Sequence, residues 1–161
     1  MFNPETNHIV MGHEHIAASA VLATSAACNL KNAKGALVLC TYTLGDAVDV
    51  TLTMDEGESA TVAKAGTYKI TTGAEFPIWT MSTAQSADTW VRQTDAITFV
   101  LVNGTYTGTT LVVFDINASI LTSNRSWIHL CSAGAASGIL GVHYILYGGR
   151  YPQAAPLTAR G

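Results

Sequence analysis

The sequence predicts an all-β domain, either an antiparallel β-sandwich or a jelly roll, over residues 33–147. The first observation is a series of about nine or ten short segments rich in strand-forming residues, roughly 8–12 residues apart with turn residues between them. The second is that no long stretch has the 3.6-residue period of an amphipathic helix. The third is length, because 161 residues suffice for one domain with a real core and are too few for two ordinary ones.

In the first half of the chain, residues 36–43 are rich in strand formers. Residues 48–54 alternate apolar and polar side chains, as a half-buried strand does. We expect a turn at 44–47 between them and a solvated tight turn at 55–58. Further strands are expected at 59–63, 67–72 and 76–81, and Pro77 confines the last of these to a sheet edge or a strand start.

In the second half, the dipeptide Asn103-Gly104 predicts a hairpin between strands at 96–102 and 109–116. A single helical turn is expected at 117–121. The one candidate for a longer helix is the alanine-rich stretch 17–30, although Ser and Thr interrupt it. The remaining strands are expected at 89–93, 126–131 and 138–147.

The two ends of the chain differ in composition from the middle. Residues 1–16 are polar with few strand formers, and the last fourteen residues contain Pro152 and Pro156. We therefore expect an N-terminal arm and lead-in segment over 1–32 and a C-terminal arm over 148–161. Such arms fray in a monomer and become ordered when they lie across neighbouring subunits.

The low charge content favours a protein that is buried in a complex. Only 12% of the residues are charged, about half of the roughly 25% that is usual in a soluble domain. A surface built from Thr, Ser, Asn, Gly and Ala is easy to desolvate against another protein. The net charge of −3, with dispersed basic residues, argues against nucleic acid as a partner.

Hydropathy and the first residues bear on localisation. No apolar run approaches the roughly 18 residues that a membrane helix needs, so we expect no membrane partner. The start of the chain lacks the basic and apolar regions of a signal peptide. We expect synthesis in the host cytoplasm without export by the usual route.

One group of metal-ligand types stands near the N-terminus, where His8, His13 and His15 accompany Glu5 and Glu14. On a strand, His13 and His15 would face the same way and could bind a transition metal, with His8 as a third ligand. An arm that is solvated or packed at an interface is the favoured interpretation, so no metal and no other cofactor is expected. A metal on a threefold axis stays open, because the axis would triple each ligand.

The remaining candidates for chemistry are weak, and we expect no enzyme. The acidic stretch 55–58 lacks the alternating spacing of a calcium loop. His129 and Cys131 would share one face of a strand without a third group to make a nucleophile. There is no GxSxG sequence and no phosphate-binding loop. The three cysteines suggest reduced thiols, and the three tryptophans suggest core or interface positions more than a sugar platform.

Four segments carry a resemblance: 48–52, 111–116, 127–130 and 141–151. In the last, a strand with a Tyr-Ile-Leu core leads into Arg150-Tyr151-Pro152. Over roughly residues 36–152 this pattern resembles small virion structural proteins of tailed bacteriophages that are encoded beside head genes.

The resemblance implies a decoration or cement protein on the surface of the phage head. Its partners would be the major capsid protein and further copies of itself, in a trimer that suits the threefold positions between capsomers. A structural module of the tail or neck, including a carbohydrate-binding adhesin, stays open as the alternative. The interface candidates are His13, His15, Arg150 and Tyr151, and no catalytic residue is implied.

Overall fold

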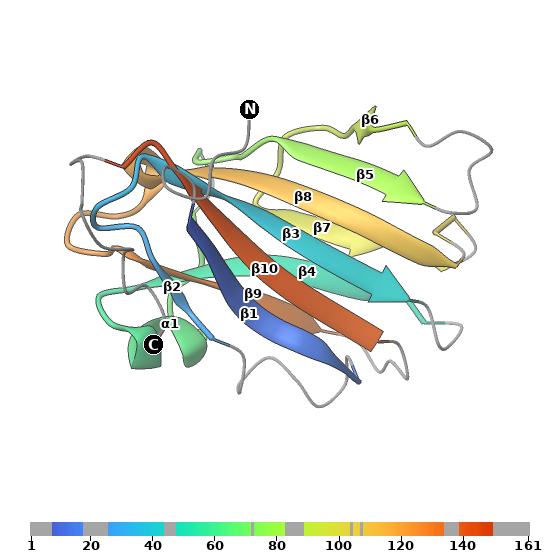
Figure 1. The fold of residues 1–161 in the computed structure, drawn as a ribbon, viewed down its shortest axis with the longest axis horizontal. Helices are drawn as coiled ribbons and strands as arrows, with labels where there is room; N and C mark the ends of the chain where they lie inside the picture. The colour runs from blue at the N-terminus through green and yellow to red at the C-terminus, as the bar shows by residue number, and fades with distance from the viewer. Residues whose placement is uncertain are drawn as a thin grey trace.

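The computed structural model describes residues 8–17, 26–43, 48–71, 73–82, 89–103, 105–106, 108–133 and 139–149. Within them, two antiparallel β-sheets pack face to face (Figure 1). The predicted antiparallel β-sandwich is therefore confirmed. Figure 1 looks onto the larger sheet, and the smaller sheet lies behind it.

The larger sheet has six strands and contains the first and last strands of the described chain. Its pairing is antiparallel throughout, so neighbouring strands place directly opposite residues on the same face. In spatial order the strands are β1 (His8–Ala17), β10 (Ile139–Tyr147), β3 (Gly35–Thr43), β8 (Thr109–Asn117), β5 (Ile78–Ser82) and β6 (Val91–Arg92).

The smaller sheet has four strands within the described residues. In spatial order they are β2 (Cys28–Asn29), β9 (Trp127–Ala133), β4 (Val50–Gly57) and β7 (Thr98–Leu101). A short helix, α1 (Ala60–Lys64), follows β4, and a 3-10 turn, η3 (Ala118–Ile120), follows β8. That turn confirms the helical turn predicted at 117–121.

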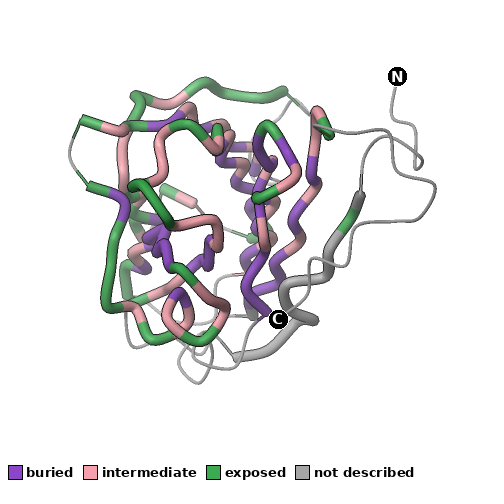
Figure 2. Tube along the Cα trace, turned by 90° about the vertical axis from the view of Figure 1, so that its left-hand side faces the viewer, coloured by how far each residue is buried: buried purple, intermediate pink, exposed green. Residues whose placement is uncertain are grey.

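The core lies between the two sheets, where the buried positions of their strands face each other (Figure 2). Tyr42, Tyr144, Phe76 and Phe114 are among the largest fully buried side chains. The rings of Phe76 and Phe114 pack edge to face, with centroids 5.8 Å apart and an interplanar angle of 85°. The long strands predicted around residues 36–43, 109–116 and 138–147 supply most of this layer in the six-stranded sheet.

The N-terminal segment corrects one expectation. Residues His8–Ala17 do not extend away from the domain as an arm, because they form β1 and pair with β10 from His8 opposite Leu146 to Ala17 opposite Ile139. Part of the expected lead-in is also core, since Cys28 and Leu30 are fully buried. The stretch 17–30 is not one helix, because its described ends lie in β1 and β2.

The segment 55–63 corrects two more expectations. The predicted solvated turn at 55–58 is wrong, because β4 continues to Gly57 and both Asp55 and Glu56 are 1% exposed. The predicted strand at 59–63 is wrong as well, because its last four residues belong to helix α1. Ser59 caps that helix by accepting a hydrogen bond from the N–H of Val62 at 3.3 Å.

The predicted hairpin at Asn103-Gly104 is also wrong. Strand β7 pairs with β4 in the four-stranded sheet, whereas β8 lies between β3 and β5 in the six-stranded sheet. The connection therefore crosses from one sheet to the other. In place of the predicted strand at 67–72, the structure has a single β-bridge between Lys69 and Asp55. The expected position of Pro77 at a strand start is confirmed, because β5 begins at the next residue, Ile78.

Candidate interaction surface

The outer face of the six-stranded sheet carries large apolar side chains. The alternation of β3 and β8 buries one set of side chains in the core and leaves the other set only partly buried on the outside. No described helix or strand covers this outer face (Figure 1). We call this surface the apolar face, and its described members are Ile9, Leu37, Leu39, Trp79, Met81, Leu111, Val113 and Ile145.

The strand register sets these side chains side by side. The central row runs from His143 through Leu39 and Val113 to Trp79, each residue directly opposite the next across the strands. Two flanking rows run from Ile9 through Ile145 and Leu37 to Asp115, and from Thr41 through Leu111 to Met81. The result is one contiguous, mainly apolar surface over five strands, which also contains His143, Thr41 and Asp115.

The outer face of the other sheet is different. Its positions on β4, β7 and β9 are occupied mainly by Thr51, Thr53, Thr98, Asp55 and His129, according to the pairing of those strands. Val100, at 40% exposed, lies on this face as well, and the pairing of β4 with β9 also places Trp127 and Cys131 there. Thr53, Asp55 and His129 are nevertheless buried, at 7%, 1% and 1% exposed, and helix α1 packs against β4 and β9. The chain itself therefore covers part of this outer face, whereas no described helix or strand covers the outer face of the six-stranded sheet.

One margin of the apolar face is closed by a partly buried tyrosine contact. The hydroxyl of Tyr147 donates to Oδ1 of Asp115 across the intervening strand β3, at 2.6 Å. Burial, and then the neighbouring Asp115 carboxylate, raises the pKa of Tyr147 well above its usual range. Gly35 makes room for this reach, because a Cβ there would lie 2.4 Å from the Tyr147 hydroxyl.

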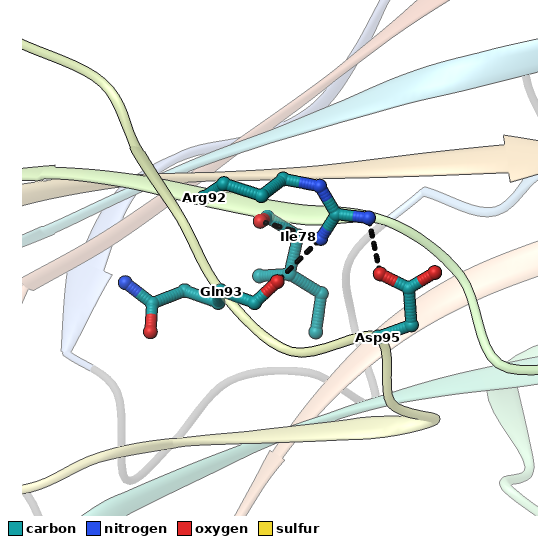
Figure 3. Close-up of polar contacts among 4 residues, drawn as sticks. All are labelled: Ile78, Arg92, Gln93 and Asp95. Carbon is teal, nitrogen blue, oxygen red and sulfur yellow. Dashed lines mark hydrogen bonds and ion pairs between the residues drawn. The ribbon is translucent and has the colours of Figure 1, made fainter.

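The opposite margin is closed by an arginine (Figure 3). The guanidinium of Arg92 lies 4.8 Å from the centroid of the Trp79 ring and forms an ion pair with Asp95. It also donates to the backbone carbonyls of Ile78, at 3.3 Å, and of Gln93. Both charges at this margin are therefore already paired within the chain.

A second cluster lies on the outer face of the four-stranded sheet. Lys69 and His129 lie directly opposite Asp55 on either side of β4, and Cys131 follows two residues along β9 on the same face. Burial raises the pKa of Asp55 to about 6, although Lys69 and the Cys131 thiol act in the opposite direction. Burial and the Asp55 charge raise the pKa of Cys131, so this thiol stays protonated, unlike the thiolate of a catalytic cysteine.

Sequence reasoning expected His129 and Cys131 to share a face, and their strand register agrees. It missed Asp55, because an acidic stretch before a glycine reads locally as a turn. The signal that could have found it is the alternation of 48–54, since Thr51 and Thr53 place Asp55 next on the same side of the strand.

A third cluster surrounds Glu56, whose side chain is 1% exposed. Its Oε1 accepts from Nη1 of Arg125 at 2.6 Å and from the Thr122 hydroxyl, and its Oε2 accepts from the Thr122 N–H at 2.9 Å. The Arg125 guanidinium also lies 3.7 Å from the centroid of the Tyr68 ring. These contacts fasten the loop before β9 to β4, which is a structural role.

The predicted site residues lie mostly outside the described side chains. His8, His13 and His15 belong to β1 by their backbone, and the pairing with β10 shifts on both sides of His13. The regular alternation behind the paired-histidine hypothesis is therefore interrupted. Arg150 and Tyr151 lie outside the described residues. Among the residues that are described, no group of three or more His, Cys, Asp or Glu could hold a metal ion.

The chain has no match among family models, curated proteins or solved structures. Within the described part of the chain, no helix is long and apolar enough to cross a membrane.

Proposed function

We propose that the chain is a non-enzymatic structural subunit of a tailed-bacteriophage particle, a decoration or cement protein that bridges capsomers on the head surface. Its partners are the major capsid protein and further copies of itself. The observation that carries the proposal is the apolar face, a mainly apolar surface that is only partly buried on the six-stranded sheet. Such a surface marks a protein interface in a folded domain.

The state of the polar clusters supports the non-enzymatic part of the proposal. The Glu56 carboxylate forms an ion pair with Arg125 and accepts two hydrogen bonds from Thr122. The raised pKa of Cys131 keeps its thiol protonated, so it is a poor nucleophile. Many copies on one particle would let individually modest interfaces add up.

The placing on a phage head rests on the resemblance in residues 36–152. Labelling particles with an antibody against the chain tests it by electron microscopy. We expect label over the heads, and particles that lack the chain should release their contents at a lower temperature. Label on the tail or neck would replace the proposal with its alternative, and unlabelled particles would overturn both.

The alternative, a tail or neck module that binds carbohydrate, has one favouring observation. Trp90 is 48% exposed, whereas Trp79 is overlaid by Arg92. An exposed indole offers a surface on which a sugar ring can stack. Binding on a glycan array that is abolished in Trp90→Ala would favour this function over the head protein.

A further inference from the structure

We infer that residues 58–67, which contain helix α1, form a pH-sensitive cover over the outer face of the four-stranded sheet. We call these residues the cover segment. It stays closed over Asp55 while that carboxyl carries a proton, and it opens more often once the proton is lost. Opening gives solvent access to Asp55, His129 and Cys131, which lie together on this face of β4 and β9. The cover segment packs on the sheet opposite the apolar face and does not depend on the proposed function.

The cover segment is held at its two ends and by the packing of its helix. It leaves β4 after Gly57 and returns to the edge of that strand at Tyr68, whose carbonyl accepts from the N–H of Glu56 at 2.8 Å. Between these ends α1 packs against β4 and β9 (Figure 1). A Cβ at Gly57 would lie 2.4 Å from the backbone nitrogen of Ala63, so the helix rests directly on the end of the strand. A helix of five residues has little stability of its own, and this packing is what keeps it in place.

Asp55 lies beneath the cover segment with its carboxyl poorly compensated. The residue is 1% exposed, and neither of its carboxyl oxygens accepts a hydrogen bond from an N–H or O–H group. Gly66, at the end of the cover segment, is next to it, because a Cβ there would lie 3.4 Å from Oδ2 of Asp55. A neutral carboxyl costs far less to bury in this way than a charged one. Loss of the proton therefore favours the open state, in which water solvates the carboxylate.

The ionisable groups around Asp55 come from each element that packs on it. They are Lys69 on the bridge opposite Asp55, His129 and Cys131 on β9, and Glu58 and Lys64 in the cover segment. Lys69 favours the charged carboxylate, but its side chain is exposed and its attraction is weakened by water. Burial and the Asp55 charge raise the pKa of Cys131, so the thiol stays neutral. Histidine is the other side chain that titrates near neutral pH, so the contribution of His129 has to be separated from that of Asp55.

Hydrogen–deuterium exchange of the full chain, followed by mass spectrometry of its peptides, measures the opening. The amides of Ala63 and Ala65, which donate within the cover segment, report on the cover, and those of β3 report on global unfolding. Dividing each rate by that of the unfolded chain at the same pH removes the base catalysis of exchange. We expect the opening constant of the cover to rise about 50-fold between about pH 4 and about pH 8, because opening returns the pKa of Asp55 from about 6 to 3.8. The β3 amides should stay better protected at every pH.

Asp55→Asn removes the titration and keeps the shape of the side chain, so it should abolish most of this rise. A rise of the same size in Asp55→Asn would overturn the cover and assign the pH dependence to His129. A wild-type chain without the rise would overturn it as well. So would equal protection of the cover and β3 amides at every pH, because the segment would then open only with the whole fold.

Lys69→Met is the second variant, and it changes an exposed side chain that the fold does not need. It removes the attraction that favours the charged carboxylate in the closed state, so the rise should become larger than in the wild type. The matched control is Lys64→Met, which removes a lysine that does not act on Asp55 and should leave the size of the rise unchanged. An unchanged or smaller rise in Lys69→Met would overturn the role of the Asp55 charge.

Discussion

The phenol oxygen of Tyr144 lies 3.1 Å from the backbone nitrogen of Leu130 and accepts its N–H. Tyr144 comes from β10 in the six-stranded sheet and Leu130 from β9 in the four-stranded sheet, so one hydrogen bond joins the two layers inside the core. Both residues are fully buried, and burial raises the pKa of Tyr144 above its usual range. The contact places a polar group in the core with its partner already supplied.

Tyr144→Phe should lower the free energy of unfolding by about 1–3 kcal/mol, because it leaves the buried N–H of Leu130 without its acceptor. The ring volume is kept, so the loss reports the hydrogen bond rather than a cavity. Urea denaturation followed by tryptophan fluorescence measures it. An unchanged midpoint with an unchanged slope would show that the two layers do not depend on this bond.

Arg125→Met should lower the free energy of unfolding by about 2–3 kcal/mol, somewhat less than the roughly 3–5 kcal/mol typical of breaking a fully buried pair. The reason is that Glu56 is 1% exposed and would lose its cationic partner, while the Arg125 side chain is 22% exposed. Adding Glu56→Gln in the same chain should recover part of the loss. Urea denaturation of the three chains gives both differences.

The exposed pair of Arg92 and Asp95 is the matched control. Asp95→Asn should cost less than about 1 kcal/mol in the same assay, because exposed ion pairs contribute little. Equal losses at the two pairs would contradict the structural role assigned to Glu56.

Gly35→Ala should be strongly destabilising, by about 1–3 kcal/mol in the free energy of unfolding. A Cβ at this position would lie 2.4 Å from the backbone oxygen of Ile116 and 2.4 Å from the Tyr147 hydroxyl. Tyr147→Ala in the same chain removes one of the two clashes and leaves the backbone one. We therefore expect the double variant to recover only part of the lost stability, as measured by thermal denaturation. Full recovery would show that Tyr147 alone requires a glycine at position 35.

The parts of the fold that could be predicted are those with a local cause. The alternation of 48–54 gives most of β4, and the apolar runs around 36–43 and 109–116 give β3 and β8. The prediction of a hairpin was wrong because strand pairing depends on partners far away in the chain. Asn103-Gly104 is a local turn signal, but β8 is drawn into the other sheet by β3 and β5.

The clusters failed to appear in the sequence for the same reason. The sequence around Asp55 predicts a solvated turn, because Lys69 and His129, which flank Asp55 in the fold, lie elsewhere in the chain. The apolar face is visible in composition as double-sided apolar strands, but only the register shows that its side chains form one surface. The low charge content that motivates a buried interface is a property of the whole chain and could not locate it.

Asp55 should make the fold less stable as the pH rises from about 4 to about 6. Its pKa is raised from 3.8 to about 6 by burial, so in this window the folded state keeps a proton that the unfolded chain releases. Above pH 6 the carboxylate is charged in both states, and the full cost of burying it remains. The rise from 3.8 to about 6, which already includes the attraction of Lys69, corresponds to a cost of about 3 kcal/mol.

Asp55→Asn separates this carboxylate from every other titrating group, because it keeps the shape of the side chain without its charge. Thermal unfolding of both chains between about pH 4 and about pH 8 gives the difference in stability at each pH. The variant should gain little over the wild type at the acidic end, where Asp55 is protonated in the fold and partly protonated in the unfolded chain. It should be more stable than the wild type at the alkaline end, where the wild type buries a charge. A difference that stays constant across this range would mean that Asp55 is as well solvated in the fold as in the unfolded chain. A variant that is less stable at the alkaline end would mean that the attraction of Lys69 outweighs the burial of Asp55.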